Sequence, residues 1–337
     1  MIELPSLIWP VLFLLAMLMG FVADRTNLCT VSAVAEIMNE RRAYILWNIT
    51  KIVLWILGVT TLIEFFFKVT PVNDDRFTLG WMSVGGGLIF GAGAALNGGC
   101  SLQTITRLGR GNLGTIFSIA GMPLGAALAR ILLIRFPEIM PSREAEPLIL
   151  PGGLQLTLVV VSSLLILWES ARLMRGYRPP QWRARLLAPD YQPASSAALL
   201  GIANGTLFSL VGTWMFTYTL IQSLTNAFYP DSVLYRPIPM QLWWLLGAYL
   251  LGIIVSAIQS RHALLQTTPK PMWIRYFFGG VLMGLGAALV PGGNDMLLFN
   301  GIPGLSLHAL PAYMAMLLGI GVSLAVLMKV FPDQEIC

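Results

Sequence analysis

Charged residues are scarce in this 337-residue chain: Asp, Glu, Lys and Arg make up 11% of it, and apolar residues make up 56%. Soluble domains usually carry about 25% charged residues, so the composition excludes an ordinary soluble protein. The apolar residues form blocks close to the roughly 20 residues that a helix needs to cross a bilayer. The sequence therefore predicts an all-α membrane protein in contact with the lipid bilayer. The net charge of +5 comes from short basic loops, so no nucleic-acid partner is expected.

Residues that could hold a metal or a cofactor are also few. The three cysteines, Cys29, Cys100 and Cys337, follow no metal-binding spacing, and their odd number excludes a fully paired disulfide framework. The two histidines, His262 and His308, form no arrangement typical of haem or quinone sites. The sequence contains no nucleotide-binding loop. We therefore expect no metal, no cofactor and no enzymatic activity.

About nine crossing segments are expected, each near the length that a bilayer requires. Alternate loops are rich in Arg, beginning with Arg41 and Arg42 and continuing at 107–110, 172–185 and 261–275. Basic loops stay in the cytoplasm, which predicts an outside N-terminus and a cytoplasmic C-terminus. The predicted segments are roughly 6–23, 43–67, 80–97, 112–134, 149–171, 197–225, 240–259, 273–290 and 307–329.

An internal repeat is visible in the glycine-rich segments. The stretch GGGLIFGAGAALNGGC (85–100) resembles FGGVLMGLGAALVPGG (278–293), with Gly86 aligned to Gly279. A fainter match joins ADRTNLCTV (23–31) to ANGTLFSLV (203–211) and aligns Cys29 with Ser209. Each pair is separated by an odd number of predicted crossings, so the second copy would be inverted, as in many transporters. Chance similarity between helices that pack through small residues is the alternative.

This repeat predicts a single membrane domain over 1–337. Its approximate inverted halves are 1–148 and 190–337, and a linker helix with a basic cytoplasmic loop fills 149–189.

The stretch NGGCSLQT (97–104) ends the third predicted crossing. Two consecutive glycines weaken a helix, so we expect a break at Gly98–Gly99, which is tolerated at membrane depth only inside protein or beside a watery cavity. A helix that restarts near Ser101 would offer free N–H groups to an anion. Neutral polar side chains surround Cys100 in the sequence, namely Asn97, Ser101, Gln103 and Thr104.

Cys29 has a comparable setting in GFVADRTNLCTV. Asp24 and Arg25 precede it, and we expect them to neutralise one another or to form a structural pair at a helix end. The following VSAVAEIM is typical of a re-entrant half-helix. Simpler interpretations also exist, because a buried cysteine is often a small apolar filler and Arg107 and Arg110 can act as topology determinants.

Together these motifs identify a resemblance. ADRTNLCTV, GAGAALNGGCSLQT and the second copy GLGAALVPGG resemble the YeeE/YedE-type sulfur transport family of bacterial inner-membrane proteins. The resemblance implies an hourglass of helices with re-entrant loops that meet at a narrow centre, uptake of thiosulfate past pathway cysteines, and a small cytoplasmic sulfur-carrier protein as a partner. By motif match, Cys29 and Cys100 would be the pathway thiols, with Asn97, Gly98, Gly99, Ser101 and Gln103 beside them.

The chain departs from this family at its second glycine motif. Family members carry a third cysteine there, whereas this chain has VPGGNDMLL, with Asn294 and Asp295. In this interpretation Asn294 replaces the missing thiol as a hydrogen-bond donor. Asp295 has three possible roles: it caps a helix, it binds a coupling proton, or it marks a different substrate. We predict a permease for a small sulfur-containing anion, thiosulfate first. The alternatives are a transporter of another sulfur or selenium compound, and a membrane thiol redox enzyme that uses Cys29 and Cys100.

Overall fold

The computed structural model describes residues 7–26, 28–69, 76–136, 152–175, 188–228, 237–260 and 269–330. The regular elements in these ranges are all helices, and seven helical segments are long and apolar enough to cross a membrane. The prediction of a multi-pass, all-α membrane protein is therefore confirmed. The number of nine crossings stays a prediction.

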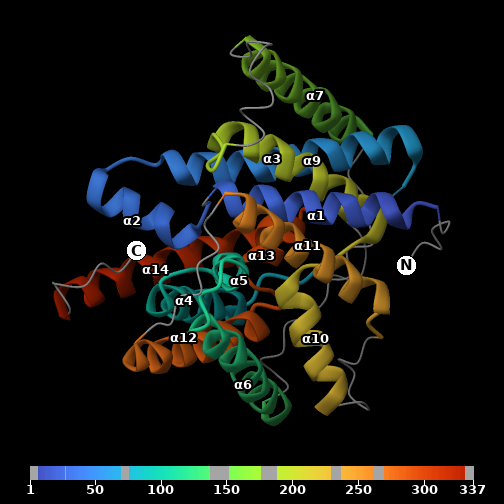
Figure 1. The fold of residues 1–337 in the computed structure, drawn as a ribbon. Helices are drawn as coiled ribbons and strands as arrows, with labels where there is room; N and C mark the ends of the chain where they lie inside the picture. The colour runs from blue at the N-terminus through green and yellow to red at the C-terminus, as the bar shows by residue number, and fades with distance from the viewer. Residues whose placement is uncertain are drawn as a thin grey trace.

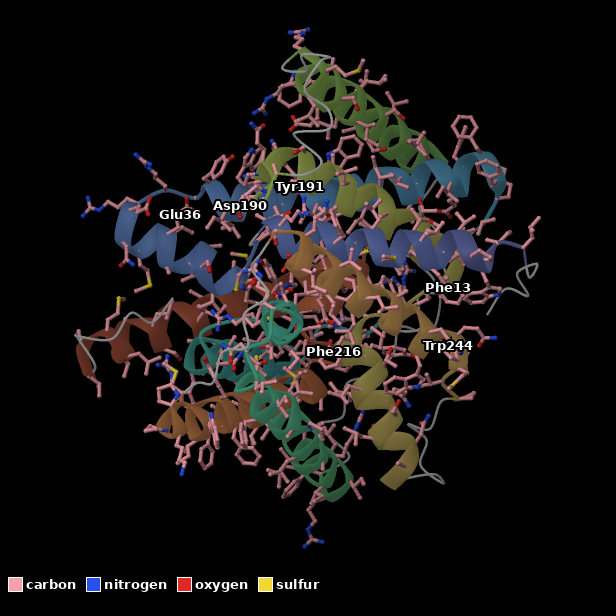
Figure 2. The ribbon with its side chains drawn as sticks, in the orientation of Figure 1. Phe13, Glu36, Asp190, Tyr191, Phe216 and Trp244 are labelled. Carbon is pink, nitrogen blue, oxygen red and sulfur yellow. The ribbon has the colours of Figure 1, made fainter. Side chains whose placement is uncertain are left out.

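Four long helices surround one of two hydrophobic cores in the described residues. They are α1 (Trp9–Thr26), α3 (Tyr44–Phe67), α9 (Pro193–Val211) and α11 (Met240–Gln259). Helix α1 packs on α11 and α9, and α9 packs on α3. Their shared core contains Leu12, Phe208 and Leu245, each with no exposed surface. The outward faces are apolar too: Trp244 is 62% exposed and points away from the core (Figure 2), as a lipid-facing side chain does.

A second group consists of α4 (Trp81–Asn97), α6 (Thr115–Arg135), α12 (Lys270–Leu289) and α14 (Ala309–Val330). Helices α4 and α12 cross through their glycine motifs. A Cβ atom added to Gly93 would lie 2.6 Å from the Met283 nitrogen, and one added to Gly279 would lie 2.9 Å from the Asn97 nitrogen. Since only glycine permits this approach, the paired glycine motifs of the sequence are explained by direct contact between two backbones.

Short helices lie between these groups. They are α2 (Thr30–Glu40), α5 (Ser101–Gly109), α10 (Phe216–Phe228) and α13 (Asn294–Met296), which continues as the π-helix η3 (Leu297–Gly301). The predicted crossing 197–225 is in fact broken after Val211 into α9 and α10. Each short helix follows a long one, in the order α1–α2, α4–α5, α9–α10 and α12–α13. The inverted relation of the two halves stays a prediction.

Helix α7 (Gly152–Arg175) lies at the edge of the molecule, against α3 (Figure 1). It occupies the predicted linker between the halves. Cys337, His262 and residues 176–187 of the basic loop lie outside the described residues.

Candidate functional site

The chain between α4 and α5 changes direction at Gly98. This residue takes the left-handed conformation (φ 70°), which glycine adopts without steric cost. Cys100 is extended and directly precedes α5, which begins at Ser101. The predicted break and restart are both confirmed. Asn97 stabilises the break, because its Nδ2 donates to the Gly99 carbonyl and to Thr104 Oγ1, each at 2.8 Å.

The chain between α1 and α2 places Cys29 in an equivalent position. Cys29 is extended and directly precedes α2, and its carbonyl accepts the Ala33 N–H at 2.9 Å. Neither Cys29 nor Cys100 caps its own helix through its side chain. Both thiols are therefore free to face other groups.

The two thiols face each other. The Sγ atoms of Cys29 and Cys100 are 3.8 Å apart, and each residue is 1% exposed. Residues 71 positions apart in the chain are thus brought together where α2 and α5 begin. The N-terminus of a helix carries a partial positive charge, so the sulfur atoms sit beside two such ends.

The corresponding break in the second half has no thiol, and its space is filled. Gly293 precedes α13 in the same extended conformation as Cys100. A Cβ atom added to Gly293 would lie 2.6 Å from Thr217 Cγ2 and 2.9 Å from Asp295 Oδ1. The Thr217 and Asp295 side chains therefore occupy the place that a third thiol would need.

Asp295 joins three short helices. Its carboxylate accepts hydrogen bonds from the Thr217 N–H (3.0 Å), the Thr217 hydroxyl (2.6 Å) and the Ser101 hydroxyl (3.0 Å). Thr217 lies in the first turn of α10, and Ser101 is the first residue of α5. A carboxylate at these positions satisfies free N-terminal donors. Asn294, beside it, accepts a hydrogen bond from the Thr30 hydroxyl at 3.1 Å, which links α13 to α2.

We expect Gly293→Cys to lower the melting temperature of the purified protein instead of supplying a useful third thiol. The new side chain would overlap Thr217, and overpacking a tight site costs about 1–3 kcal/mol. Adding Thr217→Ser removes the Cγ2 atom nearest to the new Cβ and should restore part of the loss. A melting temperature equal to that of the unmodified protein would contradict this packing.

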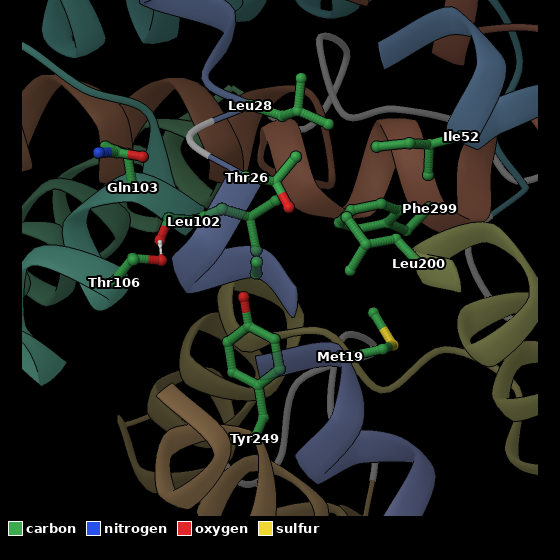
Figure 3. Close-up of a pocket in the computed structure, with 11 residues that line it drawn as sticks. Met19, Thr26, Leu28, Ile52, Leu102, Gln103, Thr106, Leu200, Tyr249 and Phe299 are labelled. Carbon is green, nitrogen blue, oxygen red and sulfur yellow. Dashed lines mark hydrogen bonds between the residues drawn. The ribbon is translucent and has the colours of Figure 1, made fainter. Parts of the chain in front are cut away.

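Two small cavities are lined by chain neighbours of the cysteines, among them Leu28 and Leu102, but not by Cys29 or Cys100 themselves. The first has a cavity volume of about 30 Å³, and its lining includes Thr26, Gln103, Thr106 and Tyr249. Figure 3 shows the Tyr249 side chain directed into it. The second includes Thr30 and Asn294 in its lining. Four apolar residues line both cavities, namely Leu28, Ile52, Leu102 and Phe299.

Comparison with known proteins places this arrangement in a family. The model of the sulphur transport family matches residues 25–322, which include both cysteines and both glycine motifs. The chain belongs to that family. A similar protein is the thiosulfate transporter TsuA of Escherichia coli (strain K12), which is 24% identical over 314 residues, covering 83% of this chain and 84% of that protein. The family resemblance of the sequence motifs is thereby confirmed.

The expected pairing of Asp24 with Arg25 in this sulphur transport protein is wrong. Asp24 pairs with Arg110, whose Nε lies 2.7 Å from Asp24 Oδ1 and whose Nη2 also donates to the Asp24 carbonyl. Arg25 points elsewhere and donates to Ser256 Oγ at 3.0 Å and to Gln259 Oε1 at 3.0 Å. Consecutive residues of a helix point about 100° apart, so neighbours in sequence cannot share one face.

Two arginines donate hydrogen bonds to backbone carbonyls at the end of α4. Arg107 donates to the Gly98 carbonyl at 2.7 Å, and Arg275 donates to the Leu96 carbonyl at 2.6 Å. Leu96 lies in the last turn of α4 and Gly98 directly follows that helix, so both arginines lie at a helix C-terminus, where cations are favourable. These arginines thus hold the α4–α5 break in place, whatever they also contribute to topology.

The fainter repeat places Ser209 at the wrong point. Ser209 lies within α9, and its hydroxyl donates to the Gly205 carbonyl at 2.7 Å, whereas Cys29 directly precedes a helix. The sequence analysis did not identify Thr30 and Thr217, which donate hydrogen bonds to Asn294 and Asp295 of the second glycine motif. It missed the buried pair Lys51 and Glu169, 2.8 Å apart. The available signal for that pair was a charged residue well inside the predicted crossing 43–67 and another inside 149–171.

Proposed function

We propose that this protein is a permease that takes up thiosulfate across the bacterial inner membrane and passes it along Cys29 and Cys100. The observation that carries the proposal is the 3.8 Å separation of the two buried Sγ atoms in a chain of the sulphur transport family. Both family and relative are transporters by name, which supports a transport role without catalysis. The bound species is then a small anion.

Two thiols in contact suit a substrate with a terminal sulfur. A thiol is a weak donor and can meet the soft sulfur of thiosulfate. At 3.8 Å apart, the two thiols allow that sulfur to keep one contact while it leaves the other. Sulfate offers only oxygens, so the thiols favour thiosulfate over sulfate.

The charge of the anion needs donors of another kind. Removing an ion from water costs several kcal/mol unless protein groups replace the water. The start of α2, the Thr30 hydroxyl and the Asn294 amide lie beside the thiols and the second cavity. The start of α5 is next to Cys100 and supplies further N–H groups. Asp295 already occupies the donors at the start of α10, which leaves the Cys29 and Cys100 side for the substrate.

We further propose the inverted repeat, an outside N-terminus and a cytoplasmic C-terminus. In support, α1 begins on one side of the molecule and α14 ends on the other (Figure 1). The packing of α1 on α11 corresponds to that of α9 on α3, and α6 on α12 corresponds to α14 on α4. A small sulfur-carrier protein would then meet the cytoplasmic side and accept the product.

The test is uptake of radiolabelled thiosulfate into cells that express the protein, with unlabelled sulfate, sulfite and selenite as competitors. Saturable uptake that resists sulfate is expected. Membrane-inserted protein without uptake would reject thiosulfate as the substrate. Competition by selenite instead would point to a selenium compound.

The thiol contact also favours a second candidate, a membrane thiol redox enzyme. Thiols 3.8 Å apart can join as a disulfide after a modest movement, since a disulfide bond is about 2.05 Å long. Purified protein supplied with a dithiol and a disulfide acceptor would then catalyse their exchange. Uptake without such turnover would leave the permease as the function.

A further inference from the structure

A polar cluster lies between the segment before α4 and the loop before α14. Arg76 Nη2 donates to the Gly304 carbonyl at 2.8 Å, and the Phe77 N–H donates to Ser306 Oγ at 3.3 Å. Ser306 Oγ lies 2.7 Å from His308 Nδ1, and the Phe77 and His308 rings meet edge to face at 5.5 Å. These contacts fasten Arg76 and His308 to one site, called the Arg76 cluster below.

Several polar atoms of the Arg76 cluster are buried without a protein partner. Within the part of the chain that the structure describes, Arg76 Nε, Arg76 Nη1 and His308 Nε2 have no hydrogen-bond partner, and His308 is only 1% exposed. The Asn300 carbonyl accepts the Gly304 N–H at 2.8 Å, and the side-chain amide of Asn300 is buried and equally without a partner among the described residues. Native proteins leave few buried polar groups unsatisfied, so such a concentration indicates a place for a polar ligand.

The chemistry of the cluster selects the ligand. A guanidinium is always charged and presents its N–H groups in a fork that fits oxygen pairs of an oxyanion. Only one of the three Arg76 nitrogens is used, by the Gly304 carbonyl. Among the ion pairs of the described residues, none involves Arg76. An imidazole can add one more N–H donor.

We propose that the Arg76 cluster binds a tetrahedral oxyanion through Arg76 and His308. Thiosulfate and sulfate both have the required oxygens. Helix η3 connects the cluster to the two small cavities, because Asn300 and Phe299 are neighbours on that helix and Phe299 lines both cavities. That the anion binds here before it reaches Cys29 and Cys100 rests on the proposed function as a thiosulfate permease. Oxyanion binding itself does not.

Binding of radiolabelled sulfate and thiosulfate to the purified full-length protein tests the proposal. Arg76→Gln is expected to weaken binding of sulfate at least tenfold, and Arg76→Lys, which keeps the charge, to weaken it less. Arg135→Gln is the matched control. Arg135 is exposed at the end of α6, on the same predicted side, and its loss should leave binding unchanged.

The double variant Cys29→Ser, Cys100→Ser separates the two proposals, because it should keep sulfate binding while thiosulfate uptake is lost. In the otherwise unmodified protein, Arg76→Gln should raise the KM of thiosulfate uptake and leave the maximal rate within about twofold. Variants are compared only after their melting temperatures show a folded protein.

Three results would overturn the proposal. The first is sulfate binding by a folded Arg76→Gln protein that equals the unmodified protein. The second is an equal loss in Arg135→Gln, which would indicate general surface charge. The third is stabilisation by phosphatidylglycerol micelles with no binding of free sulfate, which would assign the cluster to a lipid headgroup. Absence of thiosulfate uptake in every variant would reject the permease but not the oxyanion site.

Discussion

Replacing Cys100 by alanine is expected to reduce the rate of thiosulfate uptake at least about tenfold. The substitution removes one of two sulfur atoms that lie 3.8 Å apart and leaves the helix break intact, since Gly98 and Asn97 hold it. Loss of an interaction worth about 1.4 kcal/mol corresponds to a factor of ten. The measurement is initial uptake of radiolabelled thiosulfate at equal amounts of membrane-inserted protein.

Cys29→Ala should have a similar effect, and the double variant should lose little more, because the two thiols act on one sulfur atom in series. Cys337→Ala is the control that removes a thiol at the end of the chain and should leave uptake unchanged. If Cys100→Ala retains the full rate, the thiols are packing residues and the proposed pathway fails.

Glu169→Ala is expected to destabilise the protein by about 3–5 kcal/mol, because it leaves a buried charge without its partner. Lys51 Nζ lies 2.8 Å from Glu169 Oε1, and both side chains are 7% exposed. The pair joins α3 to α7, which has few other neighbours. The loss should appear as a lower melting temperature in detergent and as protease cleavage near α7.

The control removes both charges. Lys51→Met combined with Glu169→Leu replaces the pair by apolar side chains and should recover most of the stability, since such replacements are often neutral. Arg172→Ala should cost much less. Arg172 is more than half exposed and 3.3 Å from Glu169, and exposed pairs contribute roughly 0–1 kcal/mol. Equal losses in all three variants would show that the pair is not the attachment of α7.

Local rules explain why much of the cysteine site could be predicted from sequence. Adjacent glycines weaken a helix, and this rule predicted the break at Gly98–Gly99 and the restart at Ser101. The rule is not sufficient by itself, because the adjacent pair Gly279–Gly280 stays inside α12. The same letters, matched across two motifs, identified the family. The family resemblance assigned Cys29 and Cys100 to one pathway, but the 3.8 Å distance between their Sγ atoms was not predicted.

Partners that depend on tertiary packing could not be predicted. Asp24 was assigned to its neighbour Arg25, whereas its partner Arg110 lies 86 positions away. The role of Asp295 was left open among three interpretations because its donors, Thr217 and Ser101, come from two other helices. Sequence gives the positions of unusual residues, but long-range distances decide which of them meet.

The glycine contact between α4 and α12 has a consequence for how this protein can move. Where backbones touch, a displacement along the helix would bring a side chain such as Phe90 against the opposing main chain, since even a Cβ on Gly286 would lie 2.5 Å from the Phe90 nitrogen. The contact between α4 and α12 therefore prevents the two helices from sliding past one another. We therefore expect any opening toward one side of the membrane to occur at the breaks between long and short helices. Cys29 and Cys100 lie at two of these breaks, so the segments that carry the thiols are the ones expected to move.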